Sequence, residues 1–157
     1  MFNDIVVPLD GSSLAEKAVP IAAGLARLSG ATVHLVRVVS RSPELEASHI
    51  SGIGTNPQEV EYARDIAKRL VETQIKTGRS YLDGMAEQLR KDGVTVETAV
   101  KEGAADEQVL EYARVQGADL IVMGTRGHGG LKRLFLGSVT DSIVRSSEVP
   151  VLVVPAN

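Results

Sequence analysis

The sequence predicts an α/β fold in which a parallel sheet is covered by helices on both faces. Five short runs rich in β-branched residues are separated by four segments whose apolar residues recur at helical spacing. Such alternation is typical of βαβ units, whose right-handed crossovers place helices on both faces of one sheet. With five strands, the leading prediction is a single-domain, three-layer Rossmann-like sandwich with the flavodoxin-like strand order 3-2-1-4-5.

Apolar patterning distinguishes the predicted strands from one another. The runs at 120–123 and 151–154 are apolar throughout, which is typical of parallel strands buried on both faces. The run at 94–100 alternates apolar and polar residues, which indicates a half-exposed strand or an edge strand. The five predicted strands are 5–7, 32–36 with Val38 and Val39, 94–100, 120–123 and 151–154.

The first two predicted helices carry recognisable start and stop signals. Ser13 and Glu16 have the spacing of a capping box, and Gly30 is the expected end of the first helix. The second helical stretch covers 57–92 and contains Gly78, so a kinked helix and a pair of helices both remain open. In the first helix, apolar residues recur at helical spacing at Ala18, Ile21, Ala22, Leu25 and Leu28. In the second stretch, one predicted apolar face consists of Tyr62, Ile66, Leu70 and Ile75, and the other consists of Tyr81, Met85 and Leu89.

Two shorter helices and one loop complete the predicted elements. The third helix covers 104–116 and ends at Gly117, and the fourth covers 138–147. The polar stretch 40–56 is rich in serine, glycine and proline and is predicted to be a mobile loop within one domain that covers the whole chain.

The composition excludes several classes of protein. The chain of 157 residues has no cysteine, which excludes disulfides, thiolate zinc sites and thiol catalysis. Its formal net charge of −3 and its aromatic content of 3% argue against a nucleic-acid partner, and the charge also argues against an anionic membrane surface. No apolar run approaches the roughly 18 residues of a membrane span, and the N-terminus lacks the features of a signal peptide. We therefore expect a cytoplasmic protein.

A glycine-rich motif follows the fourth predicted strand. The run Gly124-Thr-Arg-Gly127 is followed after nine residues by Gly137-Ser-Val-Thr140, which opens the last predicted helix. Glycines let a backbone approach a polyanion closely, and a helix N-terminus offers unpaired N–H groups and a partial positive charge. The strand order places this motif opposite 8–12, at the switch point where ligands bind in such sheets. The motif therefore predicts a phosphate-binding site, although it is neither a Walker P-loop nor a dinucleotide fingerprint.

These motifs resemble those of the universal stress protein family, in its ATP-binding branch. The resemblance rests on the glycine pattern from Gly124 to Ser138, on the start Val7-Pro-Leu-Asp-Gly-Ser12 and on the last strand, which begins at Val149. It covers essentially the whole chain outside 40–56. It implies a regulatory module of the stress response that binds ATP with Mg²⁺ or Mn²⁺ carried by the phosphates. It also implies a homodimer formed through 151–154, and it leaves the protein partner unassigned.

The resemblance implies two groups of site residues. Around the nucleoside, Asp10 makes the contact and Pro8, Val38 and Met123 form the surrounding pocket. The phosphates are expected to be held by backbone N–H groups and hydroxyls of the glycine-rich motif. The residues of this second group are Gly124, Arg126, Gly127, Gly137, Ser138, Val139 and Thr140.

Simpler roles remain open for several of these residues. Asp10 either contacts a nucleoside or caps the helix that starts near Ser13. Ser138 and Thr140 are phosphate ligands, N-cap residues or both, and Met123 lines a pocket or only packs in the core.

The charged residues near the motif also have two interpretations. Arg126, Lys132 and Arg133 either meet phosphate or are solvated, and His128 either lies near a γ-phosphate or is an exposed loop residue. If Asp141 lies in the first turn of the last helix, a divalent cation would offset its repulsion of the phosphates.

No catalytic or metal-binding constellation emerges from the sequence. Asp10 has no Walker lysine beside it, so any hydrolysis is expected to be slow. His34 and His49 have no partner at metal-ligand spacing. The alternatives to a regulatory ATP-binding module are a slow ATPase or nucleotidyl-transfer enzyme on the same fold, and a non-catalytic dimeric interaction module.

Overall fold

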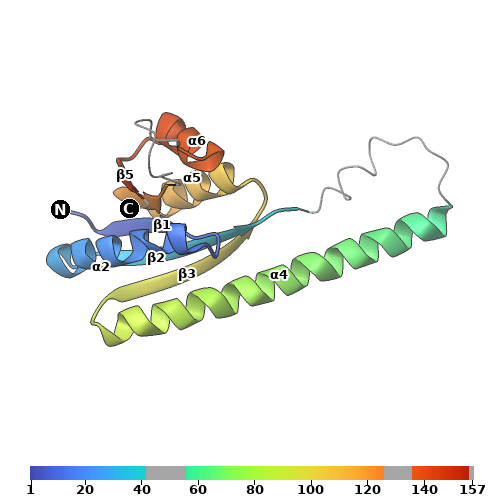
Figure 1. Ribbon diagram of the computed structural model, residues 1–157, viewed down its shortest axis with the longest axis horizontal. Helices are drawn as coiled ribbons and strands as arrows, with labels where there is room; N and C mark the ends of the chain where they lie inside the picture. Colours follow the sequence, from blue (N-terminus) through green and yellow to red (C-terminus); the bar gives the residue numbers. More distant parts are fainter. Residues whose placement is uncertain (42–55, 126–135, 156–157) are drawn as a thin grey trace.

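The computed structural model describes residues 1–41, 56–125 and 136–155. Within these ranges five parallel strands form one sheet in the order β3-β2-β1-β4-β5 (Figure 1). This order confirms the predicted α/β fold class, and β3 lies at an edge of the sheet, as its alternating pattern indicated. The strands are β1 (Asp4–Pro8), β2 (Thr32–Val39), β3 (Thr95–Glu102), β4 (Leu120–Gly124) and β5 (Val151–Val154).

Helices cover both faces of this sheet. Helix α2 and the C-terminal half of α4 pack on one face, and α5 and α6 pack on the other. The result is the three-layer arrangement that the sequence predicted. The helices of the described ranges are α1 (Ser13–Glu16), α2 (Ala18–Ser29), α4 (Pro57–Lys91), α5 (Ala105–Gln116) and α6 (Ser138–Ser146).

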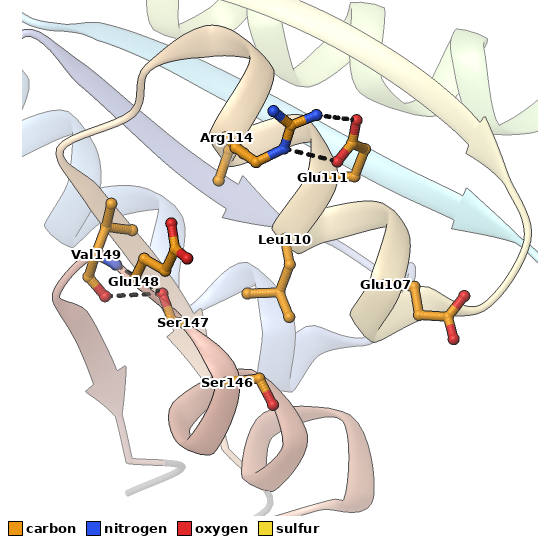
Figure 2. Close-up of a pocket in the computed structure, with 9 residues that line it drawn as sticks. Glu107, Leu110, Glu111, Arg114, Ser146, Ser147, Glu148 and Val149 are labelled. Carbon is orange, nitrogen blue, oxygen red and sulfur yellow. Dashed lines mark hydrogen bonds and ion pairs between the residues drawn. The ribbon is translucent and has the colours of Figure 1, made fainter.

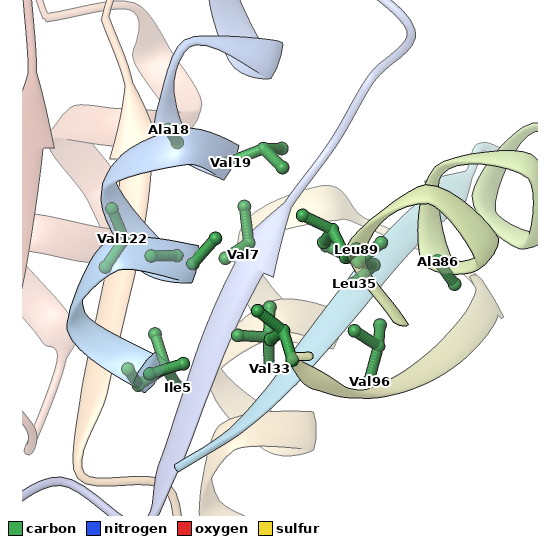
Figure 3. Packing of buried hydrophobic residues seen from close by; sticks show 14 of the residues in the cluster. Ile5, Val7, Ala18, Val19, Val33, Leu35, Ala86, Leu89, Val96 and Val122 are labelled. Carbon is green, nitrogen blue, oxygen red and sulfur yellow. The ribbon is translucent and has the colours of Figure 1, made fainter. Parts of the chain in front are cut away.

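Alternate residues of the central strands fill two hydrophobic cores. Ile5 and Val7 of β1 belong to the core beneath α2 and α4 (Figure 3), whereas Val6 belongs to the core beneath α5 and α6. All three side chains are completely buried. Because both faces of the sheet are covered, successive strand residues are apolar, and this is why no alternation is visible in most of the strand sequences.

The first predicted helix is divided into α1 and α2. Its predicted N-cap is wrong, and its predicted apolar face is confirmed at Ala18, Ala22 and Leu25 but not at Ile21 and Leu28. Ser12, rather than Ser13, is the N-cap, because its Oγ accepts a hydrogen bond of 3.2 Å from the Ala15 amide. Ile21 and Leu28 are 43% and 84% exposed. Small side chains instead let α2 lie close to the sheet. The buried residues of α2 are Ala18, Val19, Ala22, Ala23 and Ala26.

Helix α4 is a single element that continues through Gly78, so the division left open by the sequence does not occur. Its N-terminal half extends beyond the sheet (Figure 1), and there Tyr62, Ile66 and Leu70 are 70%, 40% and 52% exposed. These three residues of the predicted apolar face are therefore not part of the core. Leu89, in the C-terminal half, is buried in the core as predicted.

A buried histidine joins β1, β2 and α5. His34 is 2% exposed, and its Nε2 lies 2.8 Å from Asp4 Oδ1 while its Nδ1 lies 3.1 Å from the Tyr112 hydroxyl. Both ring nitrogens therefore have partners, as buried polar groups require. In the described ranges no group of three or more His, Asp or Glu residues is arranged to hold a metal ion. Nor does any helix in those ranges have the length and apolar character needed to cross a membrane.

Candidate functional site

Two adjoining cavities open at the carboxyl ends of β1 and β4, beside the N-terminus of α6. They share Asp10, Ala15, Gly124, Val139 and Thr140. The first cavity has a volume of about 200 Å³ and is further lined by Ser12, Leu14, Thr125, Gly137 and Ser138. The second has a volume of about 140 Å³ and is further lined by Pro8, Leu9, Val36, Val38, Ala105, Val109 and Met123. The two cavities meet at the switch point of the sheet, where the sequence placed a ligand.

The first cavity is polar because it faces the start of α6. Gly137 is the N-cap of this helix, and no side chain of the described residues caps it. Of the two alternatives for Ser138 and Thr140, the role as N-cap residues is therefore wrong. The first amides of a helix have no intrahelical acceptor, and the helix dipole adds partial positive charge there. Those amides and the hydroxyls of Ser138 and Thr140 suit an anion such as a phosphate group.

The second cavity is mainly apolar and lies under the end of β2. Val36 and Val38 stand on the same face of β2, two residues apart, and Val109 of α5 lies opposite them. Met123 is 5% exposed and belongs to the core while it also lines this cavity, so both of its predicted roles apply. A slot of this kind suits a flat, apolar ring system.

Asp10 stands where the two cavities meet. Its Oδ1 accepts a hydrogen bond of 2.8 Å from the Ser12 amide, across a turn in which Gly11 has a φ of +85°. This φ lies in the left-handed region that glycine adopts without strain. Because Ser12 caps α1, Asp10 is not the cap of that helix. Among the described residues that line the cavities, Asp10 is the only charged one.

The two glycines of the motif that the structure describes differ in their surroundings. A Cβ atom at Gly124 would lie 2.2 Å from the carbonyl oxygen of Leu14 and 3.2 Å from the Ala15 Cα. A Cβ atom at Gly137 would have no atom of the described residues within 4 Å. Gly124 is therefore needed for the close approach of α1 to β4, whereas the space in front of Gly137 belongs to the first cavity.

Polar contacts hold α6 in place. The Ser142 hydroxyl donates a hydrogen bond of 2.6 Å to the Asp106 carboxylate of α5, and this bond holds the pKa of Asp106 below its usual value. Asp141 accepts a hydrogen bond of 2.9 Å from Arg145, one helical turn further on. This pairing offsets part of the negative charge that the sequence placed in the first turn of the helix.

The predicted site residues within the described ranges all line these cavities. They are Pro8, Asp10, Val38, Met123, Gly124, Gly137, Ser138, Val139 and Thr140. Arg126, Gly127, His128, Lys132 and Arg133 lie outside the described residues.

Sequence reasoning missed several lining residues, although weak signals existed for some. Thr125 lies inside the glycine-rich motif, is 2% exposed, and donates its amide to the Val154 carbonyl at 3.0 Å. Val36 shares the strand face of Val38, and Ala105 opens the helix after β3. Leu14 and Ala15 enter the site only because α1 lies against Gly124, and no motif indicates that contact.

A larger cavity of about 340 Å³ lies elsewhere, between α5 and α6 (Figure 2). Its floor includes Leu110 and Val149, and its rim carries the carboxylates of Glu107, Glu111 and Glu148. Among the described residues that line it, the one cation is Arg114, which is already bound by both carboxylate oxygens of Glu111, at 2.7 and 3.0 Å. This excess of negative charge repels a polyanion, so the size of this cavity does not by itself make it suitable for phosphate groups.

The comparisons with known proteins agree with this architecture. The model of the universal stress protein family matches residues 1–155. The chain belongs to this family. It is 33% identical to the universal stress protein YxiE of Bacillus subtilis, over 98% of this chain and 99% of that protein. Its fold is similar to the solved structure of MJ0577 from Methanocaldococcus jannaschii, with a TM-score of 0.76 and 25% identity over 99% of this chain and 96% of that one.

A third relative has been solved with a nucleotide. It is a universal stress protein family protein from Arabidopsis thaliana with AMP bound, and its TM-score is 0.66 at 18% identity over 99% of this chain and 92% of that chain. The identity is low, so the likeness concerns the fold.

Proposed function

We propose that this universal stress protein binds ATP as a regulatory ligand in the cytoplasm. The proposal rests on one observation: the apolar second cavity, at the end of β2, adjoins the first cavity, which faces the N-terminus of α6. The slot would hold adenine, Asp10 would contact the nucleoside, and the first amides of α6 would receive the phosphates. The AMP bound to the Arabidopsis relative supports an adenine nucleotide as the class of ligand.

Several features suit a site that holds ATP rather than one that consumes it. No lysine or histidine is among the described residues that line the cavities, and the carboxylate of Asp10 is already engaged by the Ser12 amide. A Mg²⁺ or Mn²⁺ ion carried by the phosphates would neutralise charge between them and Asp10. The functional consequence would then be a change in the segment around α6, and so in association with a protein partner.

We expect wild-type protein to bind Mg·ATP with a dissociation constant of about 1 μM, because three or four charge-assisted hydrogen bonds with adenine burial can outweigh the cost of association. Calorimetric titration measures this constant, and parallel titrations with ADP, AMP and a cyclic nucleotide identify the preferred ligand. An assay for released phosphate in the same samples separates binding from turnover. Absence of binding at millimolar ATP would reject the proposal and favour a non-catalytic interaction module.

We also propose a homodimer formed through β5. This strand is an edge of the sheet, and edge strands present unpaired backbone groups that pair readily with a second copy. Leu152 projects from this edge and is 39% exposed.

Leu152→Glu is expected to convert the dimer into a monomer, because it places two like charges at the centre of the edge-to-edge contact. Analytical ultracentrifugation measures the change. Val115→Glu is the matched control, since Val115 is 63% exposed and belongs to helix α5 instead of the edge strand. A Leu152→Glu protein that remains dimeric would move the interface to another surface.

A further inference from the structure

A cluster of side chains connects α4 to the ligand loop from the face of the sheet opposite the cavities. We call it the Arg37 cluster, and it consists of Arg37, Tyr81, Glu16, Gly78 and Gly11. Val36 and Val38 face the cavities, so the intervening Arg37 projects to the other face, towards α4. Arg37 lines neither cavity, and its contacts lie behind the site.

The guanidinium of Arg37 lies between α4 and the turn at Gly11. Its Cζ is 5.4 Å from the centre of the Tyr81 ring, a cation–π arrangement. A Cβ atom at Gly11 would lie 2.7 Å from the Arg37 Nη1, so the guanidinium packs directly against this turn. The Asp10 carboxylate and the Ser12 amide close the same turn. Arg37 therefore supports the backbone that presents Asp10 to the cavities.

A second contact of Tyr81 reaches α1. Its hydroxyl donates a hydrogen bond of 2.7 Å to Glu16 Oε1. Burial, followed by this hydrogen bond, raises the pKa of Tyr81, so the hydroxyl remains a donor across the physiological pH range. Helix α1 begins at the Ser12 cap and lies against Gly124. The cluster thus forms a continuous set of contacts from α4 to both halves of the ligand site.

Gly78 has a place in this cluster that its sequence position does not suggest. It lies inside an unbroken helix, where glycine is unfavourable compared with alanine. A Cβ atom at this position would lie 3.0 Å from Arg37 Cδ and 3.4 Å from Arg37 Nε. The missing side chain of Gly78 leaves the space in which the stem of Arg37 runs.

We propose that Arg37 is a positioning residue that makes nucleotide affinity depend on α4. The proposal rests on the nucleotide site proposed above, and it assigns regulation of that site to the long helix. A displacement of α4, or of Arg37 within its contacts, would release the turn at Gly11 and so lower affinity.

The test compares two glycines of the same helix. Gly78→Ala is expected to shift the stem of Arg37 by a few tenths of an ångström, to weaken Mg·ATP binding by about threefold, and to accelerate amide hydrogen exchange of residues 9–12. Gly84→Ala is the matched control, because Gly84 is exposed and a Cβ atom there would have no atom within 4 Å. The control is expected to raise the melting temperature by about 2–4 °C and to leave affinity and exchange unchanged.

A double-mutant cycle shows whether Gly78 acts through Arg37. In an Arg37→Ala background the Cδ atom that the new Cβ would meet is absent. Gly78→Ala should then cause no further loss of affinity, although Arg37→Ala alone weakens binding. A Gly78→Ala loss of the same size in both backgrounds would overturn the proposal, because Gly78 would then act independently of Arg37.

The two readouts also separate this proposal from the proposed function. If wild-type protein does not bind Mg·ATP, the proposed function is wrong, and the positioning role of Arg37 is tested by hydrogen exchange alone. Faster exchange of residues 9–12 in Gly78→Ala, but not in Gly84→Ala, would then support that role. If the wild type binds and Gly78→Ala changes neither affinity nor exchange, the positioning role is wrong and the nucleotide site stands.

Discussion

Gly124→Ala is expected to destabilise the protein by about 3 kcal/mol or more, the upper end of the cost of overpacking. The new Cβ atom would lie 2.2 Å from the Leu14 carbonyl oxygen, 3.0 Å from the Leu14 carbonyl carbon and 3.2 Å from the Ala15 Cα. All three are backbone atoms at α1, so no side-chain rotation relieves the contact. Either α1 moves away from β4 or the end of β4 is displaced. Denaturation with urea, followed by circular dichroism, measures the loss.

The same substitution at Gly24 of α2 is the control for this experiment. Gly24 is a helical glycine with no atom within 4 Å of a Cβ position, and alanine is favoured over glycine in helices by about 0.8–1.0 kcal/mol. Gly24→Ala should therefore be slightly more stable than the wild type. If Gly124→Ala were as stable as Gly24→Ala, α1 would not lie against β4 in solution. Affinity for Mg·ATP should also fall in Gly124→Ala, because Leu14 and Ala15 line the cavities.

The contrast between Gly124 and Gly137 shows what the sequence reveals of the site. Their spacing predicts that both belong to one phosphate-binding motif. Spacing does not show what lies in front of each Cα atom, because that depends on how α1 packs, far away in the sequence. The structure assigns Gly124 to the packing of α1 against β4 and leaves open space in front of Gly137.

The fold was easier to predict than the orientation of its helices. Strand order follows from the number and alternation of apolar runs, and these runs retain their pattern wherever the helices settle. The buried positions of α2 are occupied mainly by alanines, whereas the larger Ile21 and Leu28 are exposed, so apolar spacing alone does not identify every buried residue. The predicted apolar face of the N-terminal half of α4 has the correct helical spacing. It has no sheet beneath it, because the helix is longer than the strands that it covers.

Arg37 and Gly78 illustrate a limit of a different kind. An arginine within an apolar strand and a glycine within a helix each look like an isolated irregularity in the sequence. Taken alone, Gly78 suggests a kink or a break between two helices. In the structure the two residues are packed together, since the stem of Arg37 occupies the space beside Gly78 that a larger side chain would fill. Pairs of this kind are separated by about forty residues of sequence and carry no local signal. They become visible only when the strand and the helix are placed side by side.

Gly137→Ser is expected to leave the fold intact and to weaken Mg·ATP binding by about tenfold or more, which corresponds to the loss of one charge-assisted hydrogen bond. Gly137 has φ −57° and ψ 158°, which any residue adopts, and serine is a preferred N-cap. The folded backbone therefore accommodates serine at this position. The introduced Cβ and hydroxyl would fill space at the start of α6. The hydroxyl oxygen would also accept hydrogen bonds from the first amides of α6 and so compete with the phosphates for them.

Calorimetric titration and urea denaturation of the same Gly137→Ser sample separate the two effects. Gly84→Ser provides the control, because it makes the same chemical change on an exposed face of α4 away from the cavities and should leave affinity unchanged. A variant at Gly137 with wild-type affinity would place the phosphates elsewhere than the α6 N-terminus. A variant that lost stability together with affinity would mean that Gly137, like Gly124, serves packing. Only loss of affinity at constant stability identifies Gly137 as the glycine that the ligand requires, and Gly124 as the one that the fold requires.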